Sequence, residues 1–188
     1  MENKVISNHF NEILKEITDN LDITESQYNT AVSSYQAVGK WLSDEESILH
    51  KYKPEILPQG SFLLGTMIKP MNDNDQLDVD LVCRLEGKQP GWTQYDIKKV
   101  VGDILKENGT YHKMLDLEGR RCWTLNYAES TKYHMDILPS IVCEGYKIIL
   151  EKAFSDIDID NYNEIAIRIT DKLASNYYTE HNSNNWNK

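Results

Sequence analysis

The most regular alternation of hydrophobic and polar residues lies in the segment 77–85. Successive side chains of a strand point to opposite faces of a sheet, so this pattern predicts a half-buried strand. Asp78 and Asp80 fall on the polar face, roughly 6.5 Å apart along the chain. The apolar face comprises Leu77, Val79, Leu81, Cys83 and Leu85. We therefore expect this strand to contribute to the core on one face and to present two carboxylates on the other.

Apolar residues at helical spacing predict two helices before this strand. The first covers residues 5–17. The second follows Thr24, a suitable N-cap, with Gln27 three positions later as in a capping box, and its pattern continues to Leu42. The apolar run 62–67 is too short for its periodicity to distinguish helix from strand.

The pattern after residue 85 predicts one helix and then several strands. Residues 95–106 have helical apolar spacing, and Asn108-Gly109 is expected to end this helix as a C-cap. Segment 146–154 fits either a helix or a strand. Strands are predicted at 111–117 and 121–127, joined around Glu118-Gly119, and at 133–138, ended by Pro139.

Together these elements predict an α/β protein, with a mixed, twisted sheet flanked by helices and a site on the open face of the sheet. We divide the chain into N-terminal helices that pack on the core (1–57), the core itself (58–175) and a polar tail (176–188). The tail is rich in asparagine, and we expect it to fray.

Charge and cysteine content narrow the classes of function. The net charge of −10 and the scattered basic residues disfavour binding to a nucleic-acid backbone, which requires a basic surface. Cys83, Cys122 and Cys143 are odd in number and widely spaced, which predicts buried free thiols in a reducing compartment. The N-terminus has no signal-peptide pattern, and no apolar run approaches membrane-spanning length. We therefore expect a cytoplasmic protein without a membrane partner.

The segment 58–61 has the composition of a tight turn. Pro58 restricts φ, whereas Gly60 permits backbone geometry that other residues resist. The backbone N–H groups of such a turn, together with the hydroxyl of Ser61, can bind a phosphate.

The two carboxylates of the 77–85 strand repel each other unless a cation lies between them. Mg²⁺ prefers carboxylate oxygens, and two such ions about 3.5–4 Å apart would clamp the attacking and leaving oxygens of a phosphoryl transfer. Asp136 would complete a three-carboxylate site if its strand were a neighbour of Asp78 and Asp80. The alternative, a surface aspartate on an edge strand, stays open. His134 is expected beside the site or on the surface.

Other charged clusters give weaker predictions. Asp156, Asp158 and Asp160 also alternate, but they follow no phosphate-binding turn, so we expect a solvated acidic face. Arg120 and Arg121 could reach a triphosphate, although arginines beside a hairpin are usually surface residues.

Several motifs in residues 24–171 resemble the bacterial cyclic-oligonucleotide synthases, the cGAS/DncV-like nucleotidyltransferases of antiphage CBASS systems. These belong to the polymerase-β-type superfamily, whose shared mark is Gly-Ser followed by Asp-x-Asp. Segment 134–139 is similar to the strand that carries the third carboxylate of this family. The other matching motifs are Gln59-Gly60-Ser61, Gly65-Thr66, Pro70, Asp78-Val79-Asp80 and Arg121-Cys122-Trp123.

The resemblance implies a polymerase-β-like nucleotidyltransferase core that makes cyclic di- or oligonucleotides from NTPs in antiphage defence. It implies no nucleic-acid template, and it implies regulatory or effector proteins of the same defence system as partners. Family members continue into a helical second half, which we expect to be absent here because the chain ends at residue 188. By resemblance, the catalytic residues and ligands of two Mg²⁺ or Mn²⁺ ions would be Asp78, Asp80 and Asp136, and the nucleotide-binding residues Gln59, Gly60 and Ser61.

Two alternatives to a cyclic product stay open. One is transfer of a nucleotidyl group to a protein, a linear oligonucleotide or a small molecule. The other is a truncated nucleotide-binding core without activity.

Overall fold

A computed structural model describes residues 2–72, 75–127, 133–142 and 167–179. Segment 146–154, the Asp156–Asp160 alternation and Cys143 lie outside the described residues. The helices are α1 (Glu2–Leu21), α2 (Glu25–Leu42), the 3₁₀-helix η1 (His50–Tyr52), α3 (Gly60–Leu64), α4 (Gln94–Glu107) and α5 (Gly109–Met114). The strands are β1 (Glu55–Pro58), β2 (Leu77–Leu85), β3 (Trp123–Asn126), β4 (Tyr133–Val142) and β5 (Ile167–Ile169).

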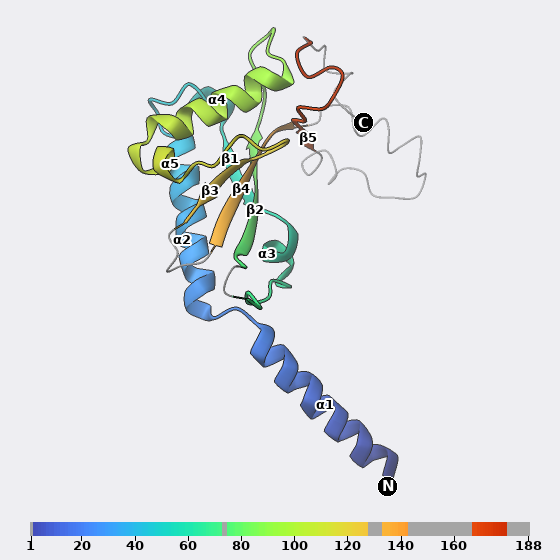
Figure 1. Cartoon of the computed structure of the whole chain (residues 1–188). Coiled ribbons are helices and arrows are strands. Elements are labelled where there is room, and N and C mark those ends of the chain that lie inside the picture. The colour runs from blue at the N-terminus through green and yellow to red at the C-terminus, as the bar shows by residue number, and fades with distance from the viewer. Residues whose placement is uncertain (1, 73–74, 128–132, 143–166, 180–188) are drawn as a thin grey trace.

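The five strands form one mixed sheet, as expected (Figure 1). The strand order is β1-β2-β4-β3, and β5 pairs with β4. The central strands β2 and β4 run parallel, whereas the other pairs are antiparallel. Two parallel strands need a long crossover connection between them. Here the crossover between β2 and β4 contains α4, α5 and β3.

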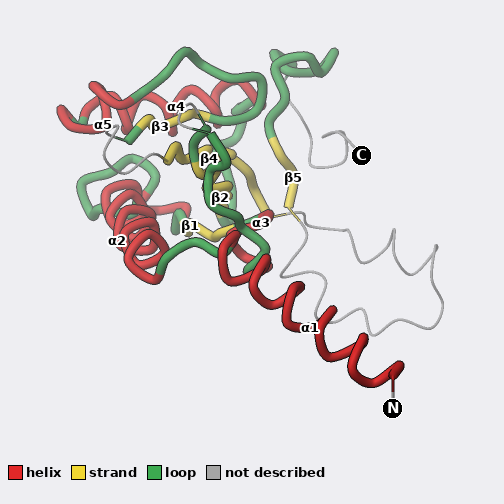
Figure 2. The backbone as a smooth tube through the Cα atoms, turned by 60° about the horizontal axis from the view of Figure 1, so that its bottom comes forward, coloured by secondary structure: helices red, strands yellow, loops and turns green. Residues whose placement is uncertain are grey.

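One face of the sheet forms the core with α2 and α4. Figures 1 and 2 show α2 along one side of the strands and α4 across one end of them. The buried apolar side chains of both helices belong to the same hydrophobic cluster as those of β2 and β4. The indole N–H of Trp41 in α2 also donates to the backbone O of Ile104 in α4, at 2.8 Å.

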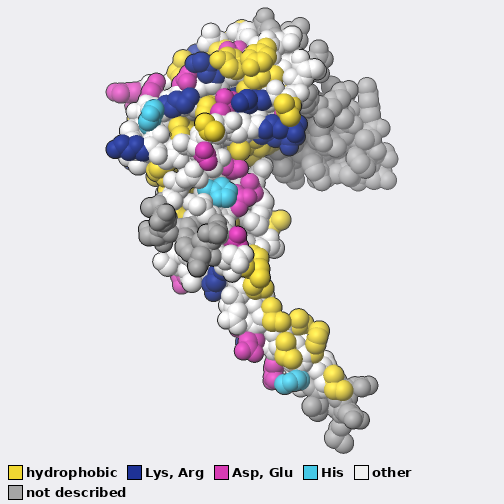
Figure 3. All heavy atoms as spheres, viewed as in Figure 1, with side chains coloured by type: hydrophobic (Ala, Val, Ile, Leu, Met, Phe, Trp, Pro, Cys, Tyr) yellow, Lys and Arg dark blue, Asp and Glu magenta, His cyan; other side chains and the backbone are white. Residues whose placement is uncertain are grey.

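The two N-terminal helices differ in their packing. α2 has the predicted capping box at Thr24 and Gln27, and it packs on the sheet. α1 projects away from the sheet, and a row of hydrophobic side chains follows its surface (Figures 1 and 3). Five apolar side chains of α1 are between 45% and 63% exposed: Ile6, Phe10, Ile13, Leu14 and Ile17. Both N-terminal helices were expected to pack on the core. Among the described residues α2 does so, and α1 does not. No helix in the described part of the chain combines the length and the apolarity needed to cross a bilayer.

Two predicted strands need correction. The segment 111–117 is not a strand, because the Asn108 side chain accepts hydrogen bonds from the N–H groups of Thr110 and Tyr111 and starts the helix α5. Of the predicted hairpin with 121–127, only an antiparallel bridge between Leu115 and Leu125 and a backbone hydrogen bond from Asp116 to Thr124 are present, and the strand partner of β3 is β4. β4 also continues past Pro139. This proline lies between the part of β4 that pairs with β3 and the part that pairs with β5, where neither strand needs its missing N–H.

The start of the predicted polar tail packs on α4. Tyr177 is only 2% exposed. The side-chain carbonyl of Asn176 accepts a hydrogen bond from the Gln94 amide at 2.9 Å. The expectation of fraying is thus wrong for residues 176–179, while residues 180–188 lie outside the described part of the chain.

Candidate metal and nucleotide site

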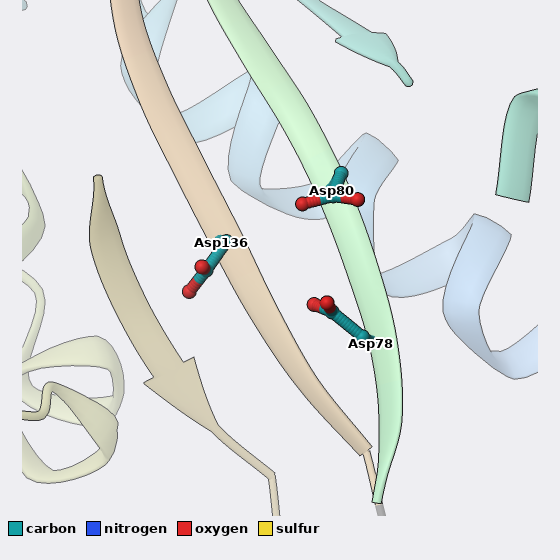
Figure 4. Close-up of side chains that lie close together, drawn as sticks. All are labelled: Asp78, Asp80 and Asp136. Atoms are coloured by element: carbon teal, nitrogen blue, oxygen red, sulfur yellow. The ribbon is translucent and has the colours of Figure 1, made fainter. Parts of the chain in front are cut away.

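The three candidate aspartates meet on the open face of the β2–β4 pair. In this register Asp80 lies opposite Asp136, and Asp78 lies opposite His134. One oxygen of each carboxylate lies within 4.8 Å of the other two. Figure 4 shows the three side chains close together on two adjacent strands, Asp78 and Asp80 on β2 and Asp136 on β4. This confirms that Asp136 is not on the opposite face of the sheet from Asp78 and Asp80.

The cluster concentrates negative charge. Burial, and then the nearby charges of Asp78 and Asp136, raise the pKa of Asp80 above its ordinary value. The folded protein therefore holds the Asp80 carboxylate less easily in its ionised form. A divalent cation would relieve this repulsion, and three carboxylates are a suitable ligand set for a hard ion such as Mg²⁺ or Mn²⁺. The residues thus fit a metal site of the type expected in this fold.

His134 lies beside one of the three carboxylates. Its Nε2 lies 3.1 Å from Oδ1 of Asp78, and its side chain is 29% exposed. The hydrogen bond from His134 lowers the pKa of Asp78. The same hydrogen bond raises the pKa of His134 itself. Of its two expected positions, His134 therefore occupies the one beside the site.

The turn before α3 lies against the same cluster. The backbone N–H of Gln59 donates to the backbone O of Asp80 at 2.8 Å. Gly60 has a φ of +57°, and a Cβ at this position would lie 2.5 Å from Oδ2 of Asp80. A residue with a side chain would therefore be strained at position 60 and would collide with the carboxylate. Ser61 follows in the first turn of α3, so the Gln59–Ser61 turn borders the aspartates.

Asp136 has two hydrogen-bond donors that the sequence did not reveal, one in β3 and one in the residue directly before it. The hydroxyl of Thr124 donates to Oδ1 of Asp136 at 2.5 Å, and the thiol of Cys122 donates to Oδ2 at 3.2 Å. Burial, and secondarily Asp136, raise the pKa of the Cys122 thiol to about 11, so the thiol carries its proton. Only the register between β3 and β4, which pairs Thr124 with Asp136, could have revealed these donors.

The free thiols and the arginine pair predicted from the sequence can also be located in the structure. Cys83 is a buried free thiol, as expected, and burial raises its pKa to about 12. Cys122 is also free but only partly buried. The guanidinium of Arg120 donates two hydrogen bonds, each of 2.7 Å, to Asp171, and Nε of Arg121 donates to the same carboxylate at 3.0 Å. These arginines thus link the segment before β3 to the segment after β5.

Comparison with known proteins identifies the family. Residues 6–153 match the family model of the SMODS domain, the "Second Messenger Oligonucleotide or Dinucleotide Synthetase domain". A c-di-GMP synthase of Roseivirga ehrenbergii is 29% identical over 170 residues, which cover 89% of this chain and 42% of the relative. The cyclic dinucleotide synthase CdnG of Bradyrhizobium diazoefficiens is 27% identical over 128 residues, which cover 68% of this chain and 29% of the relative. The chain therefore spans less than half the length of either relative.

Solved structures support the same fold. The structure of Bradyrhizobium diazoefficiens CdnG in complex with GTP has a TM-score of 0.54 and 24% identity, over 65% of this chain and 34% of that chain. The structure of Vibrio cholerae DncV with the linear intermediate pppA(3′,5′)pG has a TM-score of 0.55 and 12% identity, over 89% of this chain and 56% of that chain. At these identities the likeness indicates the fold alone. Because the SMODS description covers most of the sequence, the chain belongs to the SMODS family of nucleotidyltransferase-fold domains.

Proposed function

We propose that this chain is the catalytic core of a metal-dependent nucleotidyltransferase that makes cyclic dinucleotides from NTPs. The observation that carries the proposal is the convergence of Asp78, Asp80 and Asp136 beside the Gly60 turn in a SMODS domain. The two curated relatives support the product class, because both are named as cyclic dinucleotide synthases.

The three aspartates would hold two divalent cations, Mg²⁺ or Mn²⁺, which supply charge neutralisation for the triphosphate and for the oxygens that attack and leave. The Gln59–Ser61 turn would bind the phosphates of the NTP next to these carboxylates. A hydrogen bond between the Ser61 hydroxyl and a phosphate would contribute about 0.5–1.5 kcal/mol to binding. The ribose hydroxyl of a second nucleotide would attack the α-phosphate, pyrophosphate would leave, and a second such step would close the ring.

The biological setting is part of the proposal. Resemblance to the CBASS synthases supports a role in antiphage defence, with effector or regulatory proteins of the same system as partners and no nucleic-acid template. The free thiols of Cys83 and Cys122 support a location in a reducing compartment such as the cytoplasm. We keep the division into 1–57, 58–175 and 176–188 as part of the proposal, with two changes: β1 (Glu55–Pro58) belongs to the core sheet, and the start of the tail packs on α4.

The test is incubation of the protein with all four NTPs and Mg²⁺ or Mn²⁺, followed by mass spectrometry of the products. We expect a cyclic dinucleotide and released pyrophosphate from the parent, and neither from an Asp136→Asn variant. Linear oligonucleotides or a nucleotidylated acceptor as the only product would favour the alternative transferase. Binding of NTP without any product would favour a nucleotide-binding core.

A further inference from the structure

The three carboxylates of the site are held in different ways. Asp78 is bound by His134 of the neighbouring strand β4. Asp80 is fixed through its backbone, which accepts a hydrogen bond from Gln59, and its carboxylate lies against Gly60. Within the described part of the chain, Asp136 is the one aspartate of the three with a hydrogen-bond donor on each carboxylate oxygen. Thr124 lies in β3, and Cys122 directly precedes this strand.

The two donors use only part of the hydrogen-bonding capacity of Asp136. A carboxylate oxygen has about two lone-pair directions, so each oxygen keeps one direction for another partner. With both oxygens engaged, rotation of the carboxylate would break a hydrogen bond of 2.5 Å from Thr124 and one of 3.2 Å from Cys122. The free lone pairs are thereby kept in one orientation, with a ligand oxygen within 4.8 Å of those of Asp78 and Asp80.

β3 is itself held firmly, which makes it a suitable support. Between the two donors, Trp123 points to the buried face and is only 5% exposed. Its indole N–H donates to the backbone O of Lys98 in α4 at 2.8 Å. Its ring packs on Gly102 of the same helix so closely that a Cβ at position 102 would collide with it. The core face of β3 thus fixes the positions of Cys122 and Thr124 on the open face.

From these contacts we propose that Thr124, assisted by Cys122, is a positioning residue that orients Asp136 for metal binding. Thr124 makes the larger contribution, because a hydroxyl is a stronger donor than a thiol and its hydrogen bond is shorter. Neither side chain touches the nucleotide or the metal in this scheme, and both act through Asp136. The inference rests on the proposed function of the aspartate cluster.

The experiment replaces the hydroxyl and then restores it. Thr124→Val keeps the shape and the β-branch of the side chain but removes the donor, whereas Thr124→Ser keeps the donor. Each protein is melted at increasing Mn²⁺ concentration with nonhydrolysable analogues of ATP and GTP, and the Mn²⁺ concentration that gives half of the stabilisation is recorded. Loss of a hydrogen-bonding partner of a metal ligand typically weakens metal affinity by about 10–100-fold. We therefore expect the Mn²⁺ concentration at half stabilisation to rise by about 10–100-fold in Thr124→Val and by less in Cys122→Ala. In Thr124→Ser it should return to near the parent value.

A matched control and the parent separate the outcomes. Asn126 lies on the same face of β3 but donates to Asp116, so Asn126→Ala should leave the Mn²⁺ midpoint unchanged. If Thr124→Val lowers the melting temperature of the metal-free protein but keeps the parent midpoint, the role of Thr124 is structural and the inference is wrong. If the parent itself shows no stabilisation by Mn²⁺ and the analogues, the metal site of the proposed function fails, and the positioning role fails with it.

Discussion

The two faces of the β2–β4 pair are built from alternate residues of the same strands, yet their environments are opposite. On the core face Val79, Met135 and Ile137 are completely buried. On the open face Asp78, Asp80 and Asp136 form a cluster of like charges. The core face gains free energy from burial of apolar surface, whereas the open face gives up part of that stability to carboxylate repulsion. The comparison shows that one backbone can carry stability on one face and a site for cations on the other.

The largest expected effect on stability concerns the core face. Ile137→Ala should lower the free energy of unfolding by about 2–5 kcal/mol, because it removes buried methyl groups and leaves a cavity. Leu138→Ala is the matched control, since Leu138 is the next residue of β4 and is only partly buried. Urea denaturation of both variants measures the difference. Equal losses of stability would show that the two faces do not differ in packing as described.

The next effect concerns the charge on the open face. In the variant with Asp78→Asn and Asp80→Asn, loss of the ionised Asp80 removes a charge that burial and then the charges of Asp78 and Asp136 disfavour. Loss of the Asp78 carboxylate removes the partner of His134, so the decisive readout is the stabilisation by ligand. A ligand that binds only the folded state stabilises it by about 2.7 kcal/mol at a hundredfold excess over Kd. Mg²⁺ with a nonhydrolysable NTP should stabilise the parent in this way, and the double variant should lose this stabilisation.

Thermal melting with and without these ligands tests this prediction. The control is Glu45→Gln combined with Glu46→Gln, which makes the same change in charge at exposed positions outside the cluster. An unchanged ligand-induced shift in the Asp78 and Asp80 variant would mean that these aspartates are only a solvated face.

A smaller effect is expected where the Gly60 turn meets the open face. Gly60 and Gly65 both have positive φ, at +57° and +64°, so alanine costs about 1–2 kcal/mol of backbone strain at either position. Only at Gly60 would the added Cβ also meet Asp80, because position 65 has open space around it. Gly60→Ala should therefore weaken the stabilisation by Mg²⁺ and the NTP analogue, whereas Gly65→Ala should keep it. Ligand-induced shifts of equal size in both variants would contradict the assigned position of the turn in the site.

The smallest effect is the pH dependence from His134, because its partner Asp78 is 56% exposed and solvent weakens the interaction. The pKa of His134 is raised above its ordinary value of 6.5 in the folded protein. Its stabilising contribution is therefore fully present below pH 6.5 and is lost as the pH rises through the raised pKa. The stability advantage of the metal-free parent over His134→Gln should shrink as the pH is raised from 6 to 9.

Melting curves of both proteins across this pH range give the measurement. His9→Gln in α1 is the control, because this histidine lies outside the carboxylate cluster. A difference between parent and His134→Gln that does not change with pH would contradict the charged pair.

Much of the site was predictable because its signals are local. Alternation in segment 77–85 fixes which side chains share a face, so Asp78 and Asp80 were correctly predicted on the face opposite the core. The capping box at Thr24 is likewise a matter of four consecutive residues, and α2 begins where it predicts. Asn108 shows the limit of such reasoning. It was correctly expected at the end of α4, but its side chain also caps the start of α5, where a strand was predicted.

The sequence by itself determined the faces of β2 and β4, the helical character of α1 and α2, and the residue types that favour a cation. Only the tertiary structure decided which strands are neighbours and in what register. That register sets Asp80 beside Asp136, Asp78 beside His134, and Thr124 on the far side of Asp136. The tertiary structure also decided that the apolar face of α2 is covered and that of α1 is exposed. The physical reason is that periodicity is a property of one segment, whereas pairing depends on free energy gained between segments distant in sequence.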